Sequence, residues 1–138
     1  MIIELLKEND NSLELLLKEA FHKDVEKINI EDCLKNNIRF LCAKIDNIVV
    51  GSIMITTKYN PVRNKYIYYL DYICVKEEYQ NRGIGKSLLD EVEKLAIKEK
   101  IKEIVLESNP SRVNARNMYI NSGYQIKDTN VFIKVLGE

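Results

Sequence analysis

The stretch from Asp71 to Leu89, DYICVKEEYQNRGIGKSLL, constrains this chain more than any other part of it. It begins with apolar, strand-forming residues at 72–75, passes through a charged turn and continues with the spacing of an amphipathic helix. Gly83 and Gly85 lie in the turn, where glycine permits a positive φ and the close approach of a ligand. The first N–H groups of a helix have no partner within the helix and lie at the positive end of its dipole. We therefore expect a pyrophosphate site built mainly from backbone N–H groups, with Arg82 and Lys86 adding positive charge nearby.

A pair of glycines is compatible with other interpretations. Glycines also end strands and begin helices for purely structural reasons. A Rossmann dinucleotide site needs Gly-x-Gly-x-x-Gly and an acidic residue about 20 positions further on, but Gln80 or Asn81 stands in the place of the first glycine and the next strand ends only at Glu107. A phosphate-binding loop of the Walker type needs four residues between its glycines, and here Ile84 alone separates them. The pattern therefore disfavours both nucleotide-binding classes.

At these residues the chain resembles the GNAT superfamily of N-acetyltransferases, whose acetyl-CoA motif reads Gln/Arg-x-x-Gly-x-Gly/Ala after a strand. The matching segments are ICV at 73–75, EEYQNRGIG at 77–85 and SLL at 87–89. A second family element follows in order, Ala115-x-x-x-Tyr119-x-x-x-Gly123-Tyr124. The resemblance covers nearly the whole chain and is weakest in the first third. It implies an enzyme that transfers an acetyl group from acetyl-CoA to a primary amine, either a small molecule or a protein amino group.

The resemblance also implies which residues contact acetyl-CoA. Main-chain groups of Ile73 and Val75 would bind the pantetheine arm, and an amide of the same strand would polarise the thioester carbonyl. The side chains of Arg82 and Lys86 can equally be solvated charges at the start of a helix, because backbone does most of the binding. The residues expected to bind the cofactor are Ile73, Cys74, Val75, Gln80, Asn81, Arg82, Gly83, Ile84, Gly85, Lys86, Ser87 and Asn114.

Two residues are candidates for catalysis. The family tyrosine that matches Tyr119 protonates the departing thiolate, although Tyr119 also falls on an apolar helical stripe and can be a core residue. Side chains alternate along a strand, so Asp71 should share a face with Ile73 and Val75. Its carboxylate could take a proton from the ammonium substrate, hold the substrate's charge or pair with a lysine. Tyr69 on the same face is a further possible site residue.

Three points qualify this interpretation. Many family members have Asn seven positions before the tyrosine, where this chain has Arg112, with Asn114 two positions later. An acyl-enzyme on Cys74 is disfavoured because no His pairs with it in the sequence. A non-catalytic acyl-CoA-binding or sensor module would need only the strand and the glycine turn, so the presence of Tyr119 and Asp71 favours the enzyme.

Length and composition set broader limits. A chain of 138 residues is expected to form a single domain, 1–138. Lys plus Arg and Asp plus Glu number 21 each, so the zero net charge does not suggest nucleic acid or an anionic membrane as a partner. No long apolar run or leader pattern is seen, and we expect a cytoplasmic protein. Cys33, Cys42 and Cys74 are odd in number and have no paired spacing, and there is a single histidine, so we expect buried free thiols rather than a disulfide or a metal site. A homodimer is compatible with the family.

The hydrophobic pattern predicts the remaining elements. Helices are expected at 12–22, with Asn11 and Glu14 as a capping pair, and at 31–36, 84–100 and 112–122, the last followed by Gly123 as a C-terminal cap. Strands are expected at 2–6, 38–45, 48–58, 65–75 and 101–106, with a tight turn at Asp46-Asn47 and a final hairpin of 124–126 with 131–136. The expected architecture is an α/β fold with a mixed, mostly antiparallel sheet of six to seven strands. Helices cover both faces, and two central parallel strands splay apart.

Overall fold

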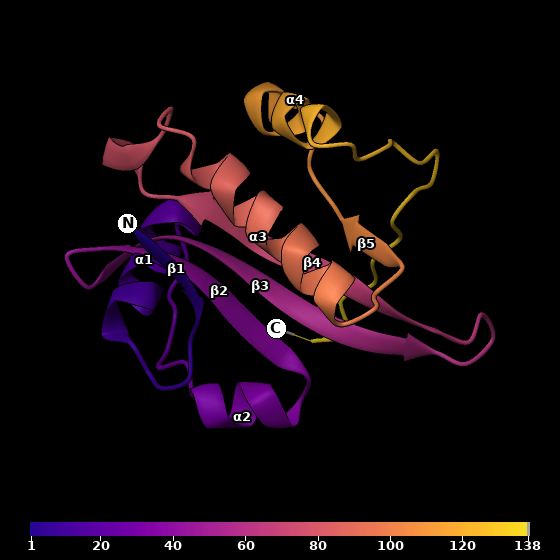
Figure 1. The fold of residues 1–138 in the computed structure, drawn as a ribbon, viewed down its shortest axis with the longest axis horizontal. Coiled ribbons are helices and arrows are strands. Elements are labelled where there is room, and N and C mark those ends of the chain that lie inside the picture. Colours follow the sequence, from indigo (N-terminus) through magenta and orange to yellow (C-terminus); the bar gives the residue numbers. More distant parts are fainter. Residues whose placement is uncertain (138) are drawn as a thin grey trace. The chain divides into compact units, whose positions relative to one another are not determined.

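The computed structural model describes residues 1–137, which divide into two compact units. The first unit, Met1–Glu107, contains a five-stranded sheet in the order β1-β2-β3-β4-β5 (Figure 1). Its strands are β1 (Ile2–Leu5), β2 (Ile38–Ile45), β3 (Ile48–Asn60), β4 (Lys65–Val75) and β5 (Glu103–Leu106). The first four pair antiparallel, and β4 and β5 pair parallel. The mixed, mostly antiparallel sheet with one parallel pair is therefore confirmed.

The turn between β2 and β3 has the backbone that its residues predict. Asp46 and Asn47 have φ values of 51° and 64°. Two left-handed residues in a two-residue loop match the right-handed twist of the flanking strands, and Asp and Asn tolerate this conformation better than most residues. The tight hairpin expected at this point is confirmed.

Helices cover both faces of the sheet in the first unit. One face is covered by α1 (Asn11–Phe21) and α2 (Ile30–Lys35), whose apolar side chains form one core cluster with β2 residues Phe40 and Cys42. The other face is covered by α3 (Ile84–Lys98), which contacts β2, β3 and β4 (Figure 1). A Cβ atom on Gly51 of β3 would point at this helix, 3.1 Å from Leu88 Cδ1. The sheet thus has an α1/α2 face and an α3 face.

The cap of α1 differs from the prediction. Asp10, not Asn11, is the N-cap, and its carboxylate accepts hydrogen bonds from the backbone N–H (2.9 Å) and the hydroxyl (2.6 Å) of Ser12. Ser12 also links the helix to the sheet, because its hydroxyl accepts a bond of 3.0 Å from the Val49 N–H. Side-chain capping of this kind contributes roughly 1 kcal/mol to stability.

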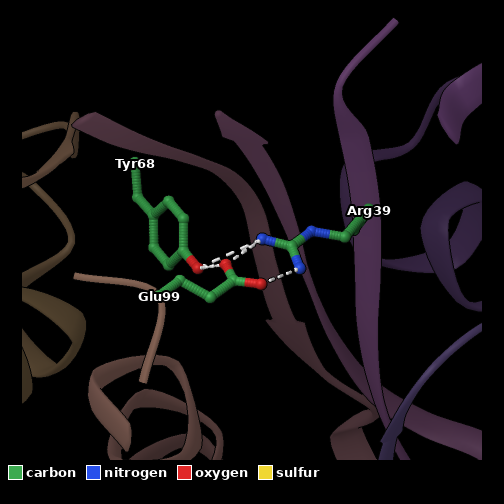
Figure 2. Close-up of polar contacts among 3 residues, drawn as sticks. All are labelled: Arg39, Tyr68 and Glu99. Atoms are coloured by element: carbon green, nitrogen blue, oxygen red, sulfur yellow. Dashed lines mark hydrogen bonds and ion pairs between the residues drawn. The ribbon is translucent and has the colours of Figure 1, made fainter. Parts of the chain in front are cut away.

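A polar cluster fastens the C-terminal end of α3 to its face of the sheet. Glu99, the C-cap of α3, is bonded to Arg39 of β2 and Tyr68 of β4 (Figure 2). Tyr68 is fully buried, and its ring also lies 5.7 Å from the Arg39 guanidinium carbon. Burial and the hydrogen bond to Glu99 raise the pKa of Tyr68 to about 12, and the Arg39 hydrogen bond lowers the pKa of Glu99.

The second unit begins at Ser108 and contains α4 (Val113–Asn121). Gly123 follows this helix with a φ of 93° and donates its N–H to the Ile120 carbonyl, as expected for a helix C-terminal glycine. Residues 124–137 contain no strand, so the predicted final hairpin is wrong and the sheet has five strands rather than six to seven. The apolar side chains of this segment are exposed, Phe132 by 93%. Local β propensity is insufficient because a strand also needs a partner backbone and a surface to pack against.

Candidate active site

The parallel pairing of β4 with β5 ends before β4 does. The last pair in the register of β4 and β5 is Leu70 with Leu106, whereas β4 continues to Val75. Beyond Leu70, β4 pairs with β3 at Asp71, Cys74 and Val75, and among the described residues no strand pairs with this stretch on the β5 side. Main-chain N–H and C=O groups left free along a strand edge can bind an extended ligand by adding to the sheet. The parallel pair is confirmed, but among the described residues it lies at the edge of the sheet and not at its centre, because no strand follows β5. The expected splay of the two strands stays a prediction.

A β-bulge interrupts β4 in this free stretch. Asp71 lies opposite Met54 and Cys74 lies opposite Ser52, so two residues of β4, Tyr72 and Ile73, face the single residue between them on β3. Tyr72 has a φ of 49°, in the left-handed region. Bulges leave an extra residue unpaired and change the direction of the side chains that follow.

The bulge overturns one expectation for Asp71. Directly opposite residues of antiparallel strands share a face, so Asp71 lies with Met54 on the α1/α2 face, while Val75, opposite Gly51, lies on the α3 face. Asp71 and Val75 do not share a face. Asp71 is exposed and has no hydrogen bond or ion pair among the described residues, so the lysine partnership considered above is absent there.

The glycine turn follows β4 directly. A short 3-10 turn, Glu77–Tyr79, leads to Gln80, whose amide nitrogen donates a 3.0 Å hydrogen bond to the Val75 carbonyl. Asn81 and Gly83 have φ values of 62° and 81°. Gly83 is the N-cap of α3, and nothing lies within 4 Å of where its Cβ would be. The turn thus contains the left-handed glycine that the motif predicts.

The first turn of α3 has no side-chain cap. Its Ile84, Gly85 and Lys86 N–H groups precede the first intrahelical bond, in which Ser87 donates to the Gly83 carbonyl at 3.0 Å. The helix also has no acidic residue in its first turn. Open N–H groups, an unopposed helix dipole and an open glycine fit an anionic group such as a pyrophosphate.

The two cations beside the turn already have partners. The Arg82 guanidinium lies 5.1 Å from the centre of the Tyr79 ring, and Lys86 forms an exposed ion pair of 3.1 Å with Asp90, one helical turn on. Surface pairs of this kind contribute little to stability and exchange readily with solvent. Backbone groups are therefore the main features of this turn, and the two cations add to its positive field.

Cys74 lies on the α1/α2 face of the sheet, whereas Val75 lies on the α3 face. The side chain of Cys74 is 9% exposed, and its sulfur lies 3.7 Å from the buried Ser52 hydroxyl. Cys42 and Cys74 are buried and Cys33 is half-buried, and the described residues hold no cluster of His, Cys, Asp and Glu side chains that could bind a metal ion. Cys74 is therefore a core residue at the edge of the candidate site.

Tyr119 and Asn114 both lie on α4 in the second unit. Tyr119 is 5% exposed, and its ring makes an edge-on contact with Tyr124, with centres 6.3 Å apart. Burial raises the pKa of Tyr119, opposed by the Arg112 charge, so the phenol keeps its proton at neutral pH. Arg112 is the N-cap residue of α4 but makes no side-chain cap. Both catalytic and cofactor roles on this helix stay predictions.

The comparisons with known proteins agree with this geometry. The acetyltransferase (GNAT) family model matches residues 4–124. The chain is 34% identical over 92 residues to L-ornithine N5-acetyltransferase NATA1 of Arabidopsis thaliana, covering 64% of this chain and 39% of that protein. The structure resembles that of an aminoglycoside acetyltransferase, meta-AAC0020, from an uncultured soil metagenomic sample (TM-score 0.84, 21% identity, covering 99% of this chain and 96% of the other). It also resembles the aminoglycoside N-acetyltransferase AAC(6')-Iy in complex with CoA (TM-score 0.77, 15% identity, 97% and 98% covered).

The two structural likenesses identify the class of fold. It is the mixed α/β fold of the acetyltransferases, and in this chain it has an N-terminal α1–α2 segment, one parallel strand pair and a glycine turn before α3. The family match, which spans most of the chain, then settles the membership: this chain belongs to the acetyltransferase (GNAT) family. The resemblance drawn from the two sequence motifs is confirmed.

Two structural features of the site were missed in the sequence. The bulge at Tyr72 has no signal in the local sequence. It arises because β4 has two residues, and β3 only one, between the pairs Asp71–Met54 and Cys74–Ser52. Gly51 was not singled out, yet it lets the first turns of α3 approach the sheet closely. Its only sequence signal was a glycine within a β-branched strand, which often marks a close backbone approach.

Proposed function

We propose that this protein transfers an acetyl group from acetyl-CoA to the primary amine of a small molecule or peptide. The observation that carries the proposal is the juxtaposition of a free stretch of β4 with the open glycine turn and uncapped start of α3. The first can bind an extended amide-bearing arm, and the second can bind a pyrophosphate. Coenzyme A contains both groups, and AAC(6')-Iy is similar in fold and is seen with CoA.

The residues of the chain divide into binding and catalytic roles. Main-chain groups at 73–75 would hold the pantetheine arm, and N–H groups at 82–87 would hold the pyrophosphate. A free strand amide at the bulge would bind the thioester oxygen and stabilise negative charge there. Gln80 acts indirectly, since its hydrogen bond to Val75 fixes the strand end against the turn.

When bound, acetyl-CoA supplies the acetyl thioester: its carbonyl carbon forms an amide bond to the amine nitrogen, and its carbon–sulfur bond breaks to leave a thiolate. The ammonium form of the acceptor must first lose one proton, for which Asp71 is the proposed base. The departing thiolate gains one proton, for which Tyr119 is the proposed acid. The second proton that the nitrogen loses on becoming an amide would restore the Tyr119 phenol. A phenol is protonated at neutral pH, as an acid requires, and burial raises the pKa of Tyr119 further. The sum is one acetamide, one free thiol and one proton released to solvent.

The relatives support an amine acceptor without naming it. Their printed activities concern ornithine and aminoglycosides, which are both amines. Because the match to the ornithine enzyme takes in less than half of that protein, its substrate is not carried over. The proposed acceptor of this chain is therefore a primary amine.

Calorimetric titration with acetyl-CoA, CoA and NAD tests the proposal. The wild-type protein should bind acetyl-CoA and CoA but not NAD. Gly83→Val should abolish binding, because a β-branched residue is strained at a φ of 81° and its side chain would fill the open space beside the N–H groups. Gly137→Val, at a position with open surroundings, is the matched control. Normal CoA binding by Gly83→Val would contradict the phosphate site, and binding without acetyl transfer to any amine would indicate a sensor module.

A further inference from the structure

The backbone of Tyr72 is unusual among the described residues. Eight residues other than glycine have a positive φ, and six of them are Asn, Asp or His, which tolerate this conformation: His22, Asn37, Asp46, Asn47, Asn64 and Asn81. Lys100 follows the end of α3, where a left-handed residue commonly stops a helix. Tyr72 alone lies inside a strand. Strain of this kind persists where the surrounding structure enforces it, and it concentrates at functional sites.

The strained residue places its ring on the α1/α2 face. Tyr68 and Leu70 lie on the α3 face, as the Tyr68 bond to Glu99 and the pairing of Leu70 with Ile55 indicate. Regular alternation would send Tyr72 to that face as well. Instead its ring makes an edge-to-face contact with Phe21 of α1, with ring centres 5.2 Å apart. The bulge therefore gives two consecutive residues, Asp71 and Tyr72, to the α1/α2 face.

These side chains form a small amphipathic surface that is open to solvent. Tyr72 is 46% exposed although its ring packs on Phe21, the last residue of α1. The neighbouring Asp71 carboxylate is exposed and has no partner among the described residues. The surface adjoins the stretch of β4 that has no strand partner on its β5 side. An aromatic pair with a free carboxylate beside it is complementary to an ammonium group on an apolar chain.

We infer that Tyr72 determines acceptor specificity, and that the acceptor is a primary amine on an unbranched alkyl chain. The alkyl chain packs against the rings of Tyr72 and Phe21, and the ammonium group lies at the Asp71 carboxylate. The inference rests on the proposed function, because it assigns the amine side of the same site. It narrows the acceptor from any primary amine to one with apolar carbons next to the nitrogen.

Acetylation of a series of n-alkylamines, from ethylamine to pentylamine, measures this contact. In the wild-type protein kcat/KM should rise by about three- to fourfold for each added methylene group, the value expected when that group leaves water. Tyr72→Phe keeps the ring and should keep this dependence. Tyr72→Asn removes the ring but tolerates the left-handed backbone, so it should abolish the dependence and leave the melting temperature and the KM for acetyl-CoA nearly unchanged. Asp71→Asn should lower kcat/KM for every amine of the series by the same factor, because Asp71 is both the proposed base and the partner of the ammonium group.

The matched control is Tyr66→Asn. Tyr66 is also an exposed tyrosine of β4, at 55%, and its ring contacts Tyr59 with centres 5.0 Å apart, but it lies at the other end of the strand. This variant should keep the full chain-length dependence. Equal effects of Tyr66→Asn and Tyr72→Asn would overturn the inference.

The outcomes separate the inference from the function on which it rests. A wild-type protein that does not bind acetyl-CoA refutes the proposed function itself. A protein that binds acetyl-CoA but shows no chain-length dependence, or acetylates none of these amines, refutes only the role of Tyr72. If Tyr72→Asn keeps the chain-length dependence of kcat/KM, the role of Tyr72 is refuted as well.

Discussion

Arg39 and Glu99 are 60 positions apart in the chain and form a two-fold hydrogen-bonded ion pair, with nitrogen–oxygen distances of 2.9 and 2.7 Å. The pair joins β2 to the end of the helix whose other end carries the glycine turn (Figure 2). The Glu99 carboxylate also accepts the hydroxyl of the buried Tyr68. The helix that begins at the proposed phosphate site is thus held to the sheet at its far end.

Arg39→Met should lower the free energy of unfolding by about 1–3 kcal/mol, because it removes both hydrogen bonds that the Arg39 guanidinium donates to the Glu99 carboxylate. The loss should be smaller than for a fully buried pair, since the Glu99 side chain is 36% exposed. Urea denaturation measures it. Arg63→Met is the control: its pair with Glu103 is more exposed, at 49% for Arg63, and its loss should cost less than about 1 kcal/mol. Equal losses would contradict a special role for the Arg39 pair.

The cluster also predicts a loss of stability at alkaline pH. The pKa of Tyr68 is about 12 in the folded protein against 10.0 for an ordinary tyrosine, because burial disfavours the phenolate and Glu99 binds the phenol. The unfolded chain therefore releases this proton first, and the contribution of Tyr68 is complete below pH 10 and declines as the pH rises toward 12. Cys42, whose pKa burial also raises to about 12, acts in the same direction.

Comparison of the wild type with Tyr68→Phe isolates the tyrosine. The variant should have a lower free energy of unfolding at pH 8, by roughly 1 kcal/mol for one lost hydrogen bond. The difference between the two proteins should shrink between pH 10 and 12, as measured by urea denaturation at each pH. A constant difference over this interval would show that Tyr68 does not titrate with the raised pKa.

Gly51→Val should lower the free energy of unfolding by about 1–3 kcal/mol through overpacking. A Cβ at this position would lie 3.1 Å from Leu88 Cδ1, 3.2 Å from Ile84 Cγ2 and 3.4 Å from the Cys74 carbonyl oxygen, before the two further methyl groups are added. Since Ile84 is the first residue of α3, the shift should also weaken acetyl-CoA binding. Denaturation and calorimetry measure the two effects, and Gly137→Val should change neither. Unchanged stability would mean that α3 moves away without cost.

Tyr119→Phe should lower kcat by about 10- to 100-fold, because the variant has no proton to give to the departing thiolate. The affinity for CoA should stay within about twofold, and the ring should keep its contact with Tyr124. Steady-state kinetics and calorimetry provide the two values. A loss of folding stability in proportion to the loss of activity would indicate a core residue instead of an acid.

The glycine turn and its neighbouring elements were predictable from the local sequence. The order of strand, turn and helix, the left-handed Gly83 and the start of α3 at Ile84 were all predictable, because they depend on glycine's missing Cβ and on helical periodicity. The α1, α2 and α4 ranges were predicted within one residue at each end, for the same reason. The single-domain organisation, the cytoplasmic location and the homodimer stay predictions.

The failures came from features that involve two segments of chain. The final hairpin is absent from the described residues because its apolar pattern needs a partner backbone to become a strand. The shared face of Asp71 and Val75 was wrong because alternation holds only in a regular strand, and the bulge depends on how β4 pairs with β3.

The sequence by itself determined the family, the glycine turn and the helices, because each of these depends on the spacing of neighbouring residues. Only the tertiary structure decided the surface of Phe21, Asp71 and Tyr72 on which the acceptor is proposed to bind. Tyr72 reaches Phe21 because strand pairing forces a left-handed residue into β4. Arg39 contacts Glu99 because its side chain points to the face of the sheet that α3 covers. Contacts across 51 and 60 positions depend on the register of the whole sheet, which short-range propensities do not specify.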